Sequence, residues 1–229
     1  MDLLKEFCAE NLTLVHEALA AGARRIELCD NLAVGGTTPS YGVIKGAVAR
    51  VREQQAQVMT MIRPRGGNFC YSSCEARTML DDIACARSLG TTGVVFGCVR
   101  SGQDGRTFLD EELVKQLVEA AKGPGSGMSA QTAPVQVTFH MAFDELDEQA
   151  QLEAIDTLAQ LGVDRILTHG GPLGTPILDN LSHLKVLVSH AAGRLIILPG
   201  GGISWQNAEQ VASLLGVAEV HGTKVVRLS

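Results

Sequence analysis

Glutamate and cysteine alternate at two places near the start of the chain. Glu6 and Cys8 lie in LLKEFCAE, and Glu27 and Cys29 lie in RRIELCDN. Residues two apart on a strand project to one face, and neighbouring strands lie about 4.8 Å apart, so thiols at equivalent heights can reach one small ion. Two thiolates suit Cu(I) best, because zinc usually takes four ligands. We therefore predict that Cys8 and Cys29 bind a metal ion, with inert packing as the alternative.

Two arginines flank a proline in IRPRGG, which spans residues 62–67. Proline fixes the backbone between the guanidinium groups, and the two glycines allow the loop to turn back. Paired guanidinium groups favour a carboxylate or phosphate through charge-assisted hydrogen bonds. We therefore predict that Arg63 and Arg65 bind a small anionic ligand. The alternative is that they pair with Glu6 and Glu27 inside the fold, because buried charges are normally paired.

A histidine and an aspartate lie four residues apart in VTFHMAFD, as His140 and Asp144. Such a pair can be a general base, a metal ligand with its orienting partner, or a structural hydrogen-bonded pair. The spacing does not choose among these roles. Glu27, His140 and Asp144 are therefore the candidate catalytic residues.

Three consecutive glycines in LPGGGIS, Gly200, Gly201 and Gly202, expose backbone N–H groups that could hold an anion. His221 follows in VHGTK. The two segments fit the phosphate cradle that many α/β barrels build after strands seven and eight. We predict an anion site here, with a tight turn into the next helix as the alternative.

These residues stand at the ends of repeated strand-and-helix units. Apolar runs predict eight strands, at 3–8, 24–29, 57–62, 92–97, 134–139, 163–168, 194–199 and 217–221. Amphipathic stretches predict seven helices between them, at 11–21, 41–53, 73–89, 109–122, 147–161, 178–192 and 204–215. Eight alternating units predict a parallel sheet closed into a single-domain (β/α)8 TIM barrel over residues 1–229, rather than an open doubly wound sheet. Little chain follows the eighth strand, so the last outer helix is short or absent.

The composition restricts the class of protein. The net charge of -6 argues against a nucleic-acid or anionic-membrane surface, which needs a basic stripe. No apolar run approaches the roughly 20 residues that cross a bilayer, and the first residues lack the pattern of a signal peptide. We therefore expect a cytoplasmic protein whose 6 cysteines are reduced rather than paired in disulfides.

Several strings, taken together, resemble the CutC family of copper-homeostasis proteins from about residue 3 to residue 223: EFCAEN, RIELCDNLAVGGTTPSYGV, MIRPRGGNFCYS, VTFHMAFD, RILTHG, PGGGI and EVHGT. The resemblance implies a cytoplasmic TIM barrel that is linked to copper tolerance, binds Cu(I) and assembles as a homo-oligomer, a dimer or a tetramer. It implies that Cys8 and Cys29 are the Cu(I) ligands. The main hypothesis is therefore a copper-homeostasis protein. The alternative is an enzyme that acts on a small phosphorylated or carboxylated metabolite at the carboxyl-terminal mouth of the barrel.

Overall fold

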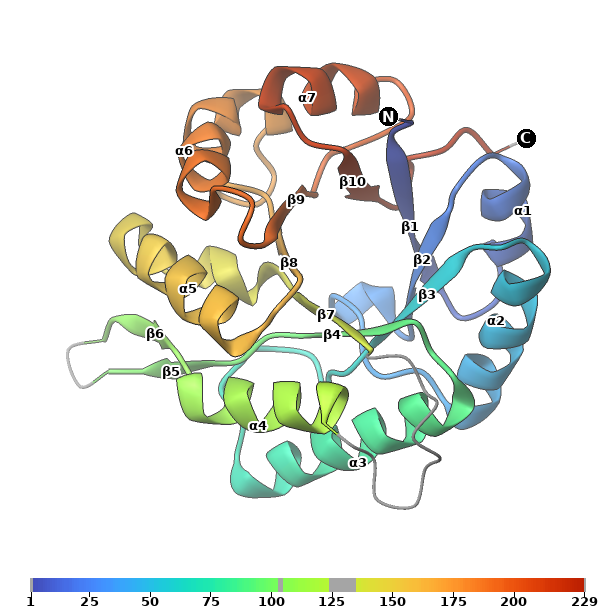
Figure 1. Cartoon of the computed structure of the whole chain (residues 1–229), viewed down its shortest axis with the longest axis horizontal. Coiled ribbons are helices and arrows are strands. Elements are labelled where there is room, and N and C mark those ends of the chain that lie inside the picture. Colours follow the sequence, from blue (N-terminus) through green and yellow to red (C-terminus); the bar gives the residue numbers. More distant parts are fainter. Residues whose placement is uncertain (1, 103–104, 124–134, 229) are drawn as a thin grey trace.

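A computed structural model describes residues 2–102, 105–123 and 135–228 of the chain (Figure 1). The strands of its main sheet are β1 (Leu4–Glu10), β2 (Arg25–Cys29), β3 (Gln57–Met61), β4 (Gly93–Phe96), β7 (Gln136–Phe139), β8 (Arg165–Thr168), β9 (Ile196–Pro199) and β10 (Glu219–Gly222). The helices are α1 (Val15–Ala20), α2 (Tyr41–Glu53), α3 (Ser73–Leu89), α4 (Glu111–Lys122), α5 (Glu148–Leu161), α6 (Leu181–Ala191) and α7 (Ala208–Leu215).

The main sheet is an eight-stranded parallel barrel with the order β10-β1-β2-β3-β4-β7-β8-β9. Figure 1 shows the strands around a central axis and the helices in an outer ring. The predicted (β/α)8 TIM barrel is therefore confirmed. A two-stranded antiparallel hairpin, β5 (Val99–Ser101) and β6 (Thr107–Leu109), was not predicted. It lies in the loop between β4 and α4, and each of its strands has 3 residues, too few for a periodic pattern.

Two predicted helices begin four residues later than the pattern indicated. The first was expected from residue 11, but β1 continues to Glu10 and Asn11 then takes a left-handed conformation with φ 53°. The last was expected from residue 204, but a turn precedes it, in which the Asn207 side chain accepts a hydrogen bond from the Ser204 backbone N–H. Asn207 is the residue that precedes α7, and its side chain makes no capping hydrogen bond to the helix. Both segments contain polar residues that favour turns over helix interiors.

The two faces of each strand differ in chemistry. Residues that face the helices are apolar and form one continuous core, including Phe7, Ile26, Leu28, Val58, Val94, Phe96, Val137, Phe139, Ile166, Ile197 and Val220. The alternate residues face the barrel axis, and many are buried polar or sulfur-containing groups: Glu6, Cys8, Arg25, Glu27, Cys29, Met59, Met61, Thr138, Arg165 and His221. A barrel interior normally holds branched apolar side chains. This interior is specialised for something other than packing.

The described residues after β10 contain no eighth outer helix, as the sequence predicted. Instead Lys224 forms a parallel bridge with Ser204, and Val225 and Val226 are buried in the outer core. Figure 1 places this segment in the gap between α7 and α1. The short tail therefore covers the part of the barrel that a last helix usually covers. Within the described residues, no helix is both long and apolar enough to span a bilayer.

Candidate metal centre

An ion-pair network lies at the amino-terminal ends of the strands, inside the barrel. The fully buried Arg25 guanidinium donates to Glu6 and, over 2.6 Å, to Glu219. Arg165 also donates to Glu219, over 2.7 Å. The expected alternative in which Arg63 and Arg65 pair with Glu6 and Glu27 is wrong, because Arg25 occupies that role for Glu6. Each buried charge here has an opposite charge in contact, as burial in a low dielectric requires.

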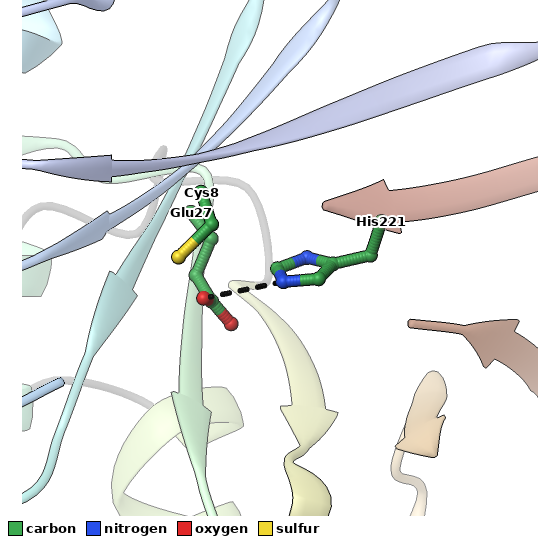
Figure 2. Close-up of side chains that lie close together, drawn as sticks. All are labelled: Cys8, Glu27 and His221. Carbon is green, nitrogen blue, oxygen red and sulfur yellow. Dashed lines mark ion pairs between the residues drawn. The ribbon is translucent and has the colours of Figure 1, made fainter. Parts of the chain in front are cut away.

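Glu6 connects this network to His221. The two residues are partners in the β1–β10 register, and Nδ1 of His221 lies 2.7 Å from Oε1 of Glu6. The other ring nitrogen, Nε2, lies 3.7 Å from Oε2 of Glu27 (Figure 2). A carboxylate that holds one histidine nitrogen and thereby aims the other is the arrangement that orients metal-binding histidines in many proteins.

Three buried donor atoms converge one layer above the network. The thiol of Cys8, a carboxylate oxygen of Glu27 and a ring nitrogen of His221 all lie within 4.8 Å of one another. Figure 2 shows the three side chains directed toward one another from β1, β2 and β10. The register explains the meeting, because Cys8 is the direct partner of Glu27, and β10 pairs with β1 on its other side. Oε1 of Glu27 is buried with no hydrogen-bond partner among the described residues.

Cys29 adjoins this group, although not at the height that the sequence suggested. We expected Cys8 and Cys29 at equivalent heights, but the register pairs Cys29 with Glu10, two residues further along β1. The strand tilt of a barrel still keeps Cys29 close, because its Sγ lies 3.6 Å from Oε2 of Glu27. Cys29 also packs in one buried cluster with Cys8 and Met61. The two predicted thiols are therefore brought together beside a carboxylate and an imidazole.

Burial and neighbouring charges shift the pKa values of Cys8, Cys29, Glu27 and His221. The hydrogen bond from the Cys29 thiol, together with the His221 imidazole, holds the pKa of Cys8 well below its usual range despite burial. The same hydrogen bond and burial raise the pKa of Cys29. Burial raises the pKa of Glu27. Although burial opposes it, the carboxylates of Glu27 and Glu6 and the Cys8 sulfur raise the pKa of His221. These shifts favour the thiolate form at Cys8 over Cys29.

His140 and Asp144 do not form the predicted pair. Nδ1 of His140 accepts the backbone N–H of Ala142, and burial, with the nearby Arg63 guanidinium, lowers the His140 pKa to about 3. Asp144 instead accepts from Thr168 and from the His169 backbone N–H, over 2.9 Å to the latter. Nε2 of His140 is buried with no partner among the described residues. His140 is therefore a neutral donor at the barrel mouth, and Asp144 ties its own loop to β8.

The two predicted anion-binding arginines both bind loop backbone. Arg63 is buried and donates to the carbonyl oxygens of Val34, Gly36 and Gly67, over 2.7 to 2.9 Å. Arg65 donates to Glu75 and to the carbonyl oxygens of residues 66, 68 and 70. Most of their donors are thus used in holding the loops at the mouth. Anion binding by Arg63 and Arg65 stays a prediction.

The glycine segment lies beside His221. A Cβ atom on Gly200 would lie 3.2 Å from Cδ2 of His221 and 2.5 Å from Leu167, so the missing side chain makes room for the imidazole. Gly201 and Gly202 have φ of 74° and 83°, which favour glycine. Both nitrogens of His221 face carboxylates, so its ring belongs to the thiol and carboxylate group. Anion binding by Gly200, Gly201, Gly202 and His221 stays a prediction.

Sequence reasoning missed Arg25 and Glu219, and it did not place His221 among metal ligands. The signal that could have found them is the alternation of side chains along a strand, which places residues two apart on the same face. Arg25 precedes Glu27 by two residues and Glu219 precedes His221 by two, so each shares a strand face with a residue that was singled out. Arg25 and Glu219 begin their strands, whereas site residues of this fold are expected at the carboxyl ends.

The fold and site together define a (β/α)8 barrel with a buried thiol, carboxylate and imidazole group on neighbouring strands. The chain belongs to the CutC family, whose sequence profile matches residues 3–226. The family protein CutC of Enterococcus faecalis is 54% identical over 224 residues, which cover 98% of this chain and 100% of that protein. The copper homeostasis protein cutC homolog of Mus musculus is 38% identical, over 95% of this chain and 72% of the relative.

Solved structures agree with this assignment. The crystal structure of CutC from Streptococcus agalactiae matches with a TM-score of 0.87 and 42% identity, over 98% of this chain and 100% of that chain. A deoxyribose phosphate aldolase from Aeropyrum pernix matches with a TM-score of 0.67 at 15% identity, over 98% of this chain and 86% of that chain. At that identity the second likeness concerns the barrel fold alone.

Proposed function

We propose that this protein takes part in copper homeostasis by binding Cu(I) through the thiols of Cys8 and Cys29. The observation that carries the proposal is that two buried thiols from neighbouring strands lie in one cluster. The lowered pKa of Cys8 supports it. Soft sulfur ligands select Cu(I), which accepts low coordination numbers. The name of the Mus musculus relative supports the same role.

The surroundings of the thiols also suit a soft, weakly hydrated ion. Cys29 is 1% exposed and Cys8 is 7% exposed, and Met61 and Leu32 pack against the same cluster. The loop after β2 approaches closely, because a Cβ atom on Gly36 would lie 3.1 Å from Sγ of Cys29. Bound Cu(I) would therefore be shielded from water and oxidants. Binding would displace the Cys29 proton, so we expect the affinity for Cu(I) to rise with pH.

An anaerobic Cu(I) titration against a competing chelator tests the proposal. We expect one high-affinity Cu(I) per chain in the native protein and loss of at least about 100-fold in affinity in the double variant Cys8→Ser, Cys29→Ser. The double variant Cys74→Ser, Cys85→Ser is the matched control, because these thiols lie on α3, away from the barrel axis. Equal affinity in the native protein and the first double variant would remove the proposed site.

A second candidate function, binding or conversion of a small phosphorylated or carboxylated metabolite, is favoured by one observation. Nε2 of His140 and Oγ1 of Thr138 are buried on the same face of one strand segment, with no partner among the described residues. Two such donors favour an electron-rich oxygen atom of a ligand. A thermal-shift screen of phosphorylated and carboxylated metabolites tests this function. A stabilising ligand whose effect is lost in His140→Phe supports it, and a screen without stabilising compounds contradicts it.

The proposal includes the place and assembly of the protein. We place it in the cytoplasm, where thiols stay reduced, as a dimer or tetramer of identical chains. Light scattering of the purified protein tests the assembly, and a monomer at micromolar concentration would contradict it.

A further inference from the structure

We propose that the same centre has a second binding mode, in which Cys8, Cys29, Glu27 and His221 together hold a divalent cation of the Zn²⁺ type. This inference shares its two thiols with the proposed function but adds two donors that Cu(I) does not need. It concerns which ions compete for the centre.

The donor set fits a divalent ion of borderline softness. Two thiolates, one imidazole and one carboxylate are the ligand types of zinc sites, which are almost always tetrahedral when four protein ligands bind. Glu27 is the central member, because its Oε2 lies 3.6 Å from Sγ of Cys29 and 3.7 Å from Nε2 of His221. Cys8 lies within 4.8 Å of both Glu27 and His221. Four donors at bond lengths of about 2.0 to 2.3 Å around one ion are about 3.3 to 3.8 Å apart, so the separations of Glu27 from Cys29 and His221 already fit. The Cys29 side chain would move toward Cys8 and His221 to complete the set.

Two further observations point to a cation at this place. Oε1 of Glu27 is buried without a partner, and a buried carboxylate oxygen without a donor or a cation is unfavourable. Glu6 holds Nδ1 of His221 at 2.7 Å, which directs Nε2 toward Glu27. That arrangement fixes both the tautomer and the orientation of a metal-binding imidazole. A Cu(I) ion bound by two thiolates would leave both of these features unexplained.

The two modes differ in what they require of Glu27. Cu(I) is satisfied by two soft ligands, whereas a divalent ion needs the hard oxygen and the imidazole to complete a tetrahedron. Replacement of Glu27 by glutamine keeps the shape and removes the charge. Because glutamine has nearly the same size as glutamate and no charge to bury, the variant is also expected to fold.

Anaerobic titration with Co²⁺, whose tetrahedral thiolate complexes have intense visible bands, tests the inference on the purified full chain. We expect one Co²⁺ per chain with those bands, displaced by one equivalent of Zn²⁺. Glu27→Gln should weaken Co²⁺ binding at least about 100-fold more than it weakens Cu(I) binding. Glu209→Gln, an exposed carboxylate on α7, is the matched control and should leave both affinities unchanged.

The outcomes separate the two proposals. Native protein that binds Cu(I) but shows no tetrahedral Co²⁺ spectrum would overturn the divalent mode and leave the proposed function intact. Native protein that binds Co²⁺ through thiolates but not Cu(I) would overturn the proposed function and support the divalent mode. Equal weakening of Co²⁺ and Cu(I) by Glu27→Gln would also overturn the two-mode inference. If Glu27→Gln fails to fold, His221→Gln carries the same comparison with the same expected difference.

Discussion

The replacement Glu6→Gln should destabilise the protein strongly at neutral pH, because Glu6 neutralises two buried partners. The Arg25 guanidinium and the Nδ1 atom of His221 both contact its carboxylate, and the side chains of Glu6 and Arg25 are at most 1% exposed. Burial opposes ionisation, but these two partners lower the Glu6 pKa to about 2 from an ordinary value of 4.5. At about 1.4 kcal/mol per pKa unit, that difference corresponds to about 3 kcal/mol of stability. Breaking a buried ion pair from one side costs a similar amount.

The contribution of Glu6 to the free energy of unfolding depends on pH in a direction that its pKa shift determines. The pKa of Glu6 is depressed in the folded state, so its contribution is complete above about pH 4.5 and is lost as the pH falls toward 2. Urea unfolding at pH 7 should therefore show a free energy of unfolding about 3 kcal/mol lower for Glu6→Gln, and this difference should shrink below pH 4.5. Glu209→Gln is the control. Glu209 is a largely exposed residue of α7 that pairs with Lys5, a neighbour of Glu6 on β1, and this pair should contribute less than about 1 kcal/mol. A loss below 1 kcal/mol for Glu6→Gln would refute the reasoning.

Three further predictions concern the barrel mouth. His140 has a pKa of about 3 in the folded protein against an ordinary 6.5. The free energy of unfolding of the native protein should therefore fall as the pH drops below 6.5, by about 3 kcal/mol at pH 4.5. Urea unfolding of His140→Gln should lack this part of the decrease. Arg63→Lys should lower the free energy of unfolding by about 2 kcal/mol, because an ammonium group cannot reach three carbonyl oxygens in a fork; an unchanged urea midpoint would contradict this. Gly36→Ala should weaken Cu(I) binding, since it strains a residue with φ 85° and crowds the Cys29 sulfur, whereas Gly42→Ala, with open space around it, should not.

Much of the barrel could be predicted from local pattern. The alternation of apolar runs with helical stretches specified eight parallel strands and seven helices, because each unit carries its own periodicity. The ends of α3 and α5 agree with the predicted ranges, and the next residues, Gly90 and Gly162, have φ of 86° and 85°, which favour glycine. The hairpin of β5 and β6 could not be predicted from the sequence, because its strands are too short to show a periodic pattern. Its pairing depends on how the loop between β4 and α4 packs in the folded protein.

The residues of the candidate site could be predicted from the sequence more completely than their positions relative to one another. Glu-x-Cys on two strands identified Cys8, Cys29 and Glu27, because a charge and a thiol are unusual on a buried strand face. The offset of Cys29 from Cys8 depends on the register between strands, which no local pattern specifies. His221 joins the group only because the last strand closes against the first, a contact between residues 215 positions apart.

Arg25 shows the same limit in another form. The sequence contains many arginines, and the two around Pro64 stand out because a proline lies between them and two glycines follow. The structure uses those two to hold loop carbonyl oxygens, and it uses the unremarked Arg25 to neutralise Glu6. Which guanidinium group faces a buried carboxylate is decided by strand register and barrel closure, and both are long-range properties.

The most direct test of the central claim is a crystal of the protein loaded anaerobically with one equivalent of Cu(I), with anomalous scattering measured at the copper edge. We expect a single anomalous peak inside the barrel, within bonding distance of the sulfur atoms of both Cys8 and Cys29. A peak at any other place in the molecule, or no peak in a protein that retains its fold, would contradict it.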